Sequence, residues 1–341
     1  MASPTWDPPA DWARIRTLET HAGGEPLRIV TDGLPSIPGD TMLAKRRTFR
    51  EDHDHLRTAL VWEPRGHADM YGAIPTDPVS SSGDLGVLFL HNDGYSTMCG
   101  HGVIALVTAA IETEMVAADG DRPTVALDTP AGLVTARATR EDGQVTAVSF
   151  ENVPSYVVGL DRTVDVPGYG TVRYDLAFGG AFYAYVDAAT LGLGLGPADA
   201  ESLVAAGRGI KRAVAARETF DHPDDDMNFL YGTIFRGDPR GDADSRNVCV
   251  FADGQVDRCP TGTGVSGRLA IRAARGNLAV GDRFVVESII GSTFAGQIAD
   301  RTTVGDRSAV VPVVEGSGAV TGRSEFVLDP TDPFREGFLL R

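Results

Sequence analysis

The stretch from Gly102 to Ile111 constrains the fold more than any other part of the chain. Its sequence is GVIALVTAAI, in which ten residues pass without a charged side chain. A helix that is apolar on all sides has to be enclosed by other elements, because no face of it suits water. We therefore expect strands or helices to surround this segment completely.

The rest of the chain favours strands over a helix bundle. Its 40 glycines are spread among short apolar segments, a pattern typical of many strands joined by tight turns. The sequence predicts strands within 84–94, 171–187 and 247–257, a hairpin turn at 141–144, helices over 39–61 and 196–218, and mostly strands after Asp282.

Two stretches share one layout, which indicates a weak internal duplication. Cys99-Gly-His-Gly-Val and Thr261-Gly-Thr-Gly-Val each follow a strand-like segment and begin a short helix. A length of 341 residues also favours two domains. We expect a first lobe over 1–153 with Cys99, a second over 154–325 with Thr261, and a segment over 326–341 that returns to the first lobe.

Composition excludes several classes of partner. A net charge of −16 argues against nucleic acid and anionic membrane surfaces. No apolar run approaches the length of a membrane span, and the first residues lack the pattern of a secretory signal. Three cysteines, Cys99, Cys249 and Cys259, without framework spacing suit free thiols in a reducing compartment, so we expect a cytoplasmic protein.

Each Gly-x-Gly turn is suited to bind an anion. Glycines let a ligand approach the backbone, and the first N–H groups of a helix have no partner within it. Together with the positive end of the helix they attract carboxylate or phosphate. A thiol at this place, such as Cys99, can have its pKa lowered from about 8.5 to roughly 3.5–7.5. Cys99 is therefore a candidate nucleophile or proton-abstracting base.

Four blocks in fixed order resemble the proline racemase family. They contain His21 with Gly24-Glu25-Pro26, residues 63–70 (EPRGHADM), residues 94–101 (GYSTMCGH) and residues 257–264 (DRCPTGTG). The resemblance implies a diaminopimelate-epimerase-like α/β fold of two similar lobes, each a curved, mainly antiparallel sheet around a central helix. It also implies a cofactor-independent enzyme with a small imino-acid substrate, without a metal, and a homodimer.

The chain departs from the racemases at the second catalytic position. The family places a cysteine in each lobe, one to remove the α-proton and one to return it on the other face, whereas this chain has Thr261. A hydroxyl is far too weak an acid to replace that thiol. The Cys/Thr pair is similar to that of family members that dehydrate trans-3-hydroxy-L-proline to Δ1-pyrroline-2-carboxylate. We therefore expect a hydro-lyase.

The resemblance also assigns roles to individual residues. Cys99 is the base that removes the α-proton, and Thr261 hydrogen-bonds the leaving hydroxyl or a water molecule. Asp257 binds the ring ammonium through a charge-assisted hydrogen bond. The substrate carboxylate is expected to contact the loops at Gly100, His101, Gly262 and Thr263.

Three other functions stay open at this point. A racemase or epimerase acting on proline or 4-hydroxyproline would need Cys259 to take the place of the missing acid, although Pro260 stiffens that segment. An inactive amino-acid-binding protein would keep the carboxylate site without the chemistry. A cysteine hydrolase is disfavoured, because no His and Asn or Asp stand at an informative spacing from Cys99.

Several patterns compete with this interpretation. Residues 262–267 match a dinucleotide-binding fingerprint with Glu287 twenty residues beyond, yet no run of βαβ units follows. His53, His55, His67 and Asp69 suggest a metal, but residues two apart on a helix face different ways. His67 and Asp69 instead buttress the site in our interpretation. Cys249 is expected in the core, and His222 has no assigned role.

Overall fold

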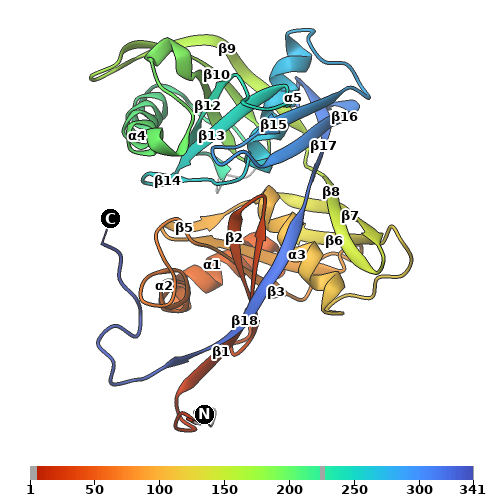
Figure 1. Ribbon diagram of the computed structural model, residues 1–341, viewed down its shortest axis with the longest axis vertical. Coiled ribbons are helices and arrows are strands. Elements are labelled where there is room, and N and C mark those ends of the chain that lie inside the picture. Colours follow the sequence, from red (N-terminus) through yellow and green to blue (C-terminus); the bar gives the residue numbers. More distant parts are fainter. Residues whose placement is uncertain (1–5, 223–226, 341) are drawn as a thin grey trace.

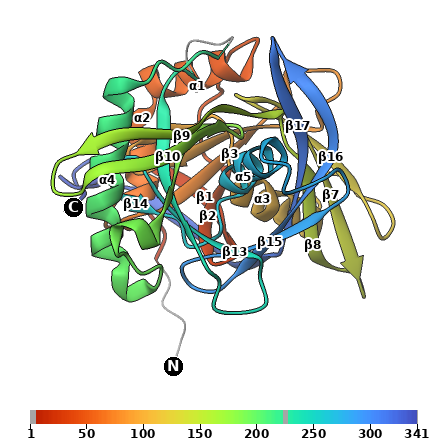
Figure 2. The same ribbon diagram turned by 90° about the horizontal axis from the view of Figure 1, so that it is seen from above.

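The protein consists of two stacked lobes that share one continuous network of strands (Figure 1). The structure is a computed structural model that describes residues 6–222 and 227–340. Each lobe wraps its strands around one central helix, α3 in the first lobe and α5 in the second. Seen from above, both central helices lie near the middle of the molecule with strands around them (Figure 2).

Before the chain enters the second lobe, its described residues form eight strands and three helices. Its elements in chain order are β1 (Ala13–Ala22), β2 (Glu25–Asp32), α1 (Met42–Asp52), α2 (Asp54–Val61), β3 (Tyr71–Thr76), β4 (Leu85–His91), β5 (Gly94–Ser96), α3 (Gly100–Glu112), β6 (Thr124–Thr129), β7 (Gly132–Glu141) and β8 (Gln144–Glu151).

The second lobe continues directly from β8. Its elements are β9 (Ser155–Val166), β10 (Gly170–Phe178), β11 (Phe182–Asp187), the 3₁₀ turns η1 (Ala188–Leu191) and η2 (Pro197–Asp199), α4 (Ala200–Arg217), β12 (Leu230–Gly237), β13 (Ser245–Phe251), β14 (Gln255–Val256), α5 (Gly262–Ala274), β15 (Arg283–Glu287), β16 (Thr293–Val304) and β17 (Arg307–Gly316).

Strand pairing confirms that the lobes are pseudo-symmetric. In the first, β2 is parallel to β3 and β4 is parallel to β6, while the neighbouring pairs are antiparallel. In the second, β11 is parallel to β12 and β13 is parallel to β15, again between antiparallel pairs. The central helices occupy equivalent places, since α3 follows β5 and α5 follows β14.

Strands from both halves of the chain connect the lobes. β17 of the second lobe pairs with β8 of the first, and β18 (Gly318–Leu328) then runs antiparallel to β1 along its whole length. In Figure 1 the blue strand β18 descends from the upper lobe beside β1 and β2. The end of the chain is thereby held to its beginning.

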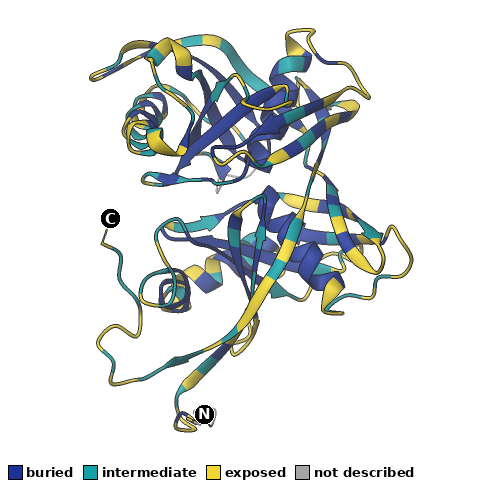
Figure 3. Cartoon of the chain, in the orientation of Figure 1, coloured by how far each residue is buried: buried dark blue, intermediate teal, exposed yellow. Residues whose placement is uncertain are grey.

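The uncharged segment 102–111 forms most of α3, and every residue of that helix from Gly100 to Ile111 is buried. The predicted enclosure is confirmed, and Figure 3 shows the same burial in both lobe centres. Each large aliphatic side chain buried in this way contributes about 1.5–3 kcal/mol to the free energy of folding.

The predicted hairpin turn at 141–144 is also confirmed. Asp142 and Gly143, which lie between β7 and β8, both have positive φ.

One predicted helix is wrong in extent. The segment 39–61 does not form a single helix, because α1 ends and α2 begins at His53, whose φ of −135° is not helical. Asp54 starts the second helix and binds Arg57 and the hydroxyl of Tyr95. The break turns α2 so that its residues Leu56 to Val61 are buried.

Candidate active site

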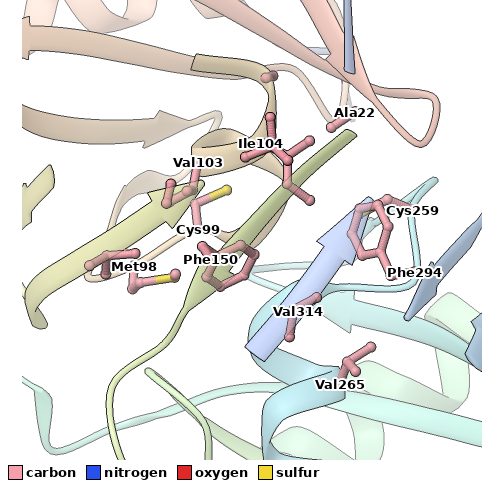
Figure 4. Close-up of a cluster of buried hydrophobic side chains, with 14 of the residues drawn as sticks. Ala22, Met98, Cys99, Val103, Ile104, Phe150, Cys259, Val265, Phe294 and Val314 are labelled. Carbon is pink, nitrogen blue, oxygen red and sulfur yellow. The ribbon is translucent and has the colours of Figure 1, made fainter. Parts of the chain in front are cut away.

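Cys99 is the N-cap of α3 and lies at the meeting point of the lobes. Its Sγ accepts a hydrogen bond from the N–H of Gly102 at 3.3 Å, as a helix-capping side chain does. The backbone of Cys99 is extended, and the residue is 4% exposed. In Figure 4 Cys99 lies beside Val103 and Phe150. The thiol is therefore fixed at the helix start.

Thr261 is the N-cap of α5, but its side chain does not cap the helix. Its Oγ1 donates to Oδ2 of Asp257 at 2.5 Å, and its backbone has a φ of +66°. Positive φ is unusual for a β-branched residue, and such strained positions cluster at functional sites. Thr261 is 5% exposed.

The two helix starts pack against each other. A Cβ added to Gly100 would lie 2.6 Å from Cα of Gly262, and one added to Gly262 would lie 2.8 Å from Cα of Gly100. Real Cβ atoms do not approach backbone so closely. Glycine is therefore required at both positions, and the two sequence-predicted loops are adjacent in space.

The two helix starts leave backbone donors without a protein acceptor. The first N–H groups of a helix have no partner inside it. Within the described residues, no hydrogen bond joins the N–H of Gly100, His101, Gly262 or Thr263 to a protein acceptor. These donors and two positive helix ends are suited to a carboxylate.

Two buried carboxyl groups stand at the site, Asp257 and Glu25. Glu25 is fully buried, and its Oε2 accepts a hydrogen bond from the N–H of Arg258, while Oε1 has no hydrogen-bond partner among the described residues. Burial, reinforced by the negative charge of Asp257, raises the pKa of Glu25 well above its usual range. Burial also raises the pKa of Asp257 to about 7, against the hydrogen bond from Thr261 and the charge of Arg258. Burial therefore disfavours the charged form of both carboxyl groups, and Asp257 titrates near pH 7.

The predicted lowering of the pKa of the Cys99 thiol is wrong, because the thiol is enclosed. Burial raises the pKa of Cys99 well above its usual range, and this outweighs the lowering by the Gly102 N–H and the Tyr71 hydroxyl. Asp257 and Glu25 raise it further. A positive charge brought between these groups would favour the thiolate, because it reverses the local field.

His101 is a neutral neighbour of the thiol. Its Nδ1 lies 3.3 Å from Sγ of Cys99, and burial lowers the pKa of the imidazole to about 3. The ring packs edge-on against Tyr71, with their centroids 4.7 Å apart. His101 can therefore exchange a hydrogen bond with Cys99 but does not supply a charge.

A group of hydroxyls lines the same region. Tyr71, Ser96 and Tyr231 are mutually hydrogen-bonded, with 2.7 Å between the Ser96 and Tyr231 oxygens. In the second lobe, Tyr183 shares a hydrogen bond of 2.7 Å with Oγ1 of Thr263. Because Tyr71 belongs to β3 and Tyr231 to β12, the cluster also holds the two lobes together.

An ion pair between lobes stands next to the site. Nη2 of Arg258 lies 3.0 Å from Oδ2 of Asp69, and both side chains line an interlobe cavity of about 550 Å³. Asp69 thus supports the site through Arg258. His67 is more exposed and contacts the carbonyl of Ala68.

The remaining candidates have structural partners. Cys259 is fully buried beside Phe294 (Figure 4), and its Cβ lies close to Gly23. Its Sγ accepts a hydrogen bond from the N–H of Thr261 at 3.4 Å. Cys249 belongs to β13 and lies in the hydrophobic core.

Glu287 and His222 also have structural partners. Oε2 of Glu287 accepts hydrogen bonds from the N–H groups of Arg240 and Gly241. The ring of His222 packs on Phe178. Within the described residues no group of three or more His, Cys, Asp or Glu side chains could hold a metal.

Sequence reasoning missed Glu25, Tyr71 and Tyr231 as members of the site. Glu25 stands in the block that carried the resemblance, between Gly24 and Pro26, yet its pattern alone does not indicate burial. Tyr71 follows a second such block. Tyr231 has no local signal at all, because only the pairing of distant strands brings it to Ser96.

Comparisons with known proteins match this chain over nearly its full length. The family described as proline racemase matches residues 17–339. A trans-3-hydroxy-L-proline dehydratase of Colwellia psychrerythraea is 46% identical, covering 98% of this chain and 96% of the relative. A 3-hydroxyproline 2-epimerase of Burkholderia multivorans is also 46% identical, covering 96% and 98%.

A solved structure has the same fold. The crystal structure of a hydroxyproline epimerase from Agrobacterium vitis, with bound trans-4-hydroxy-L-proline, superposes with a TM-score of 0.90 at 37% identity and covers 96% of both chains. The two-lobed fold inferred from the sequence is thereby confirmed. Among the described residues, no helix is long and apolar enough to cross a membrane.

Proposed function

This chain is a member of the proline racemase family, and from that premise we propose that it dehydrates trans-3-hydroxy-L-proline to Δ1-pyrroline-2-carboxylate with its own side chains. The observation that carries the proposal is the hydrogen bond from Oγ1 of Thr261 to Asp257. At the place where a racemase needs a thiol acid, this chain has a hydroxyl that already donates its proton to a carboxylate.

Substrate binding would use both charges of the imino acid. The carboxylate accepts hydrogen bonds from the free N–H groups at Gly100, His101, Gly262 and Thr263. The ring ammonium pairs with ionised Asp257, whose pKa of about 7 allows that state at neutral pH. The raised pKa of Glu25 shows that the buried site disfavours a second negative charge beside Asp257.

The bound ammonium would also create the base. Burial and two carboxyl groups keep Cys99 as a thiol in the free site, and a cation beside Asp257 offsets their field. The thiolate then removes the α-proton, while the N–H groups around the carboxylate stabilise the developing negative charge. His101 and the Gly102 N–H hold the sulfur in place.

Stereochemistry makes loss of water the productive outcome. In trans-3-hydroxy-L-proline the 3-hydroxyl lies on the same face of the ring as the α-hydrogen. Cys99 therefore faces both: the Cα–H bond breaks, the electron pair forms the C2–C3 double bond, and the C3–O bond breaks. The proton on Cys99 passes to the departing oxygen, which releases water and restores the thiolate. The enamine then tautomerises to the imine by losing a proton from nitrogen and gaining one at C3.

A substrate comparison tests the proposal. The purified protein should convert trans-3-hydroxy-L-proline to an imine that o-aminobenzaldehyde traps as a coloured adduct. The cis-3-hydroxy isomer, with its hydroxyl on the opposite face from Cys99, should react at least tenfold more slowly. Proline and 4-hydroxyproline should give no adduct. A protein that leaves the trans-3-hydroxy compound unchanged would refute the dehydratase.

An epimerase is the second candidate, because of Cys259. Its Sγ lies 3.4 Å from the backbone N of Thr261, so a second thiol is near the second loop. A relative named as a 3-hydroxyproline 2-epimerase is 46% identical to this chain. Inversion at Cα with uptake of solvent deuterium would identify this activity. A binding protein would instead retain the imino acid without turnover.

A further inference from the structure

A cavity of about 350 Å³ lies in the second lobe, away from the site between the lobes. Its walls come from β10, β11, β12 and the C-terminal half of α5. Five arginines and three aspartates line it, although the chain as a whole has a net charge of −16. A positive cavity in so acidic a protein indicates a local requirement for negative charge.

The aspartates of the cavity are already engaged by arginines at its edge. Arg173 and Arg275 both bind Asp161, at 2.5 and 2.8 Å, and Arg275 also binds Asp175 at 2.7 Å. Arg236 lies 3.3 Å from Asp187. Three of the five arginines are therefore paired with the aspartates of the cavity. Arg268 and Arg272 are not part of these ion pairs.

Arg268 is a buried cation with neutral partners only. It is 7% exposed, and its Nη1 donates to Oγ of Ser245 at 2.7 Å and to Oδ1 of Asn247 at 2.9 Å. Its guanidinium also stands 5.1 Å from the ring centroid of Phe284. Among residues 6–222 and 227–340, no carboxylate comes within ion-pair distance of it. A buried charge without a counter-ion is costly.

Arg272 lies one turn further along α5 and is also without a carboxylate in the described part of the chain. Its guanidinium packs 4.4 Å from the ring centroid of Phe284, and its Nε is buried with no hydrogen-bond partner in residues 6–222 and 227–340. Burial and the charges of Arg236 and Arg272 lower the pKa of Arg268 to about 9. Three guanidinium groups therefore repel one another around one cavity.

We propose that this cavity is a binding site for a small anion with at least two oxygens, either a phosphate or a dicarboxylate, held by Arg268 and Arg272 with Arg236 at its edge. Guanidinium groups match such anions through paired N–H donors, and the bound charge would remove the repulsion among them. None of the residues in the cavity wall belongs to the candidate active site. The proposal therefore stands or falls separately from the proposed function.

Calorimetric titration of the full-length protein tests this site with two probes, inorganic phosphate and malonate, at constant ionic strength set with chloride. We expect at least one of them to bind. Arg272→Gln should weaken that binding roughly tenfold, the loss of about one charge-assisted hydrogen bond. Arg236→Gln, a change at a partly exposed position, should weaken it less. The probe that binds more tightly identifies the class of ligand.

The matched control is Arg301→Gln, which removes an exposed arginine of β16 outside the cavity. It should bind like the parent. The active-site N–H groups are identical in all these proteins, so any anion bound there adds the same signal to each. Failure of both probes to bind the parent, or equal affinity in the parent, Arg272→Gln and Arg236→Gln, would overturn the proposal.

Discussion

The two loops that begin α3 and α5 share a sequence pattern but differ in what their first residue contacts. Both helices have 13 residues, and in both the second and fourth residues of the pattern are glycines. Cys99 caps its own helix through Sγ, with an extended backbone. Thr261 has a φ of +66°, does not cap its helix, and donates backwards to Asp257.

The difference originates four residues upstream. Asp257 precedes Thr261 by four positions and accepts its hydrogen bond. At the same distance before Cys99 stands Tyr95, whose hydroxyl donates a hydrogen bond to Asp54. Only the second loop therefore has a carboxylate for its first side chain. A duplicated scaffold can thus supply two different chemical groups to one site, and the change of a few residues decides which reaction follows.

The largest expected effect comes from removing the thiol of the first loop. Cys99→Ser replaces the base with a much weaker one, and general-base catalysis contributes roughly 10²–10⁴-fold. Turnover of trans-3-hydroxy-L-proline should fall by about that factor without loss of the fold. Cys259→Ser is the matched control and should keep most of the activity, because that thiol packs beside Gly23 and accepts only a backbone hydrogen bond. Equal losses in both variants would contradict the assignment of the base.

Next in size is the contact between the loops. Gly100→Ala places a methyl group 2.6 Å from Cα of Gly262, and backbone cannot give way as a side chain can. We expect a loss of about 3 kcal/mol or more in the free energy of unfolding, measured with urea. Gly209→Ala is the control in α4, because its Cβ would meet only a side-chain atom of Val166 at 3.3 Å. A fully stable Gly100→Ala protein would show that the helix starts are separated.

Restoring the symmetry of the loops should change the products. Thr261→Cys supplies a second thiol, so the ratio of epimer to imine should rise by roughly tenfold or more, because protonation on the far face competes with loss of water. The epimer is resolved by chiral chromatography. Thr261→Ser keeps a hydroxyl for Asp257 and should keep the parent ratio. An unchanged ratio in both variants would mean that the second loop does not influence the outcome.

The last expected effect is a pH dependence of substrate binding that comes from the carboxylate of the second loop. Burial raises the pKa of Asp257 to about 7, so below that pH the carboxylate becomes neutral and the substrate ammonium loses its partner. KM should therefore rise about tenfold for each pH unit below 7 and level off above it, since one unit changes the ionised fraction tenfold. Measuring KM from pH 5.5 to 8.5 tests this. A constant KM down to pH 5.5 would show that Asp257 keeps the usual pKa of an aspartate.

The sequence predicted those parts of the molecule that depend on local patterns. The absence of charge between Gly102 and Ile111 was enough to predict an enclosed helix. The two Gly-x-Gly turns were enough to predict two loops in equivalent places. The prediction of a single helix over 39–61 was wrong, because nothing in the periodicity of this segment marks a break at His53. The break follows from the packing of α2.

The electrostatics of the site could not be predicted, because they depend on burial by the other lobe. A helix start lowers the pKa of a thiol in isolation, but Cys99 is enclosed together with Asp257 and Glu25, and their combined effect has the opposite sign. Glu25 itself approaches Arg258 across more than two hundred residues of sequence. Local patterns contain no information about such pairs.

The central claim is that unequal loops lead to loss of water and not to inversion at Cα. The most direct measurement is to incubate the parent protein with trans-3-hydroxy-L-proline in D₂O and to follow both products by NMR. We predict conversion to the imine, with little or no cis-3-hydroxy-D-proline carrying deuterium at Cα. Formation of that deuterated epimer as fast as the imine, or faster, would contradict the account.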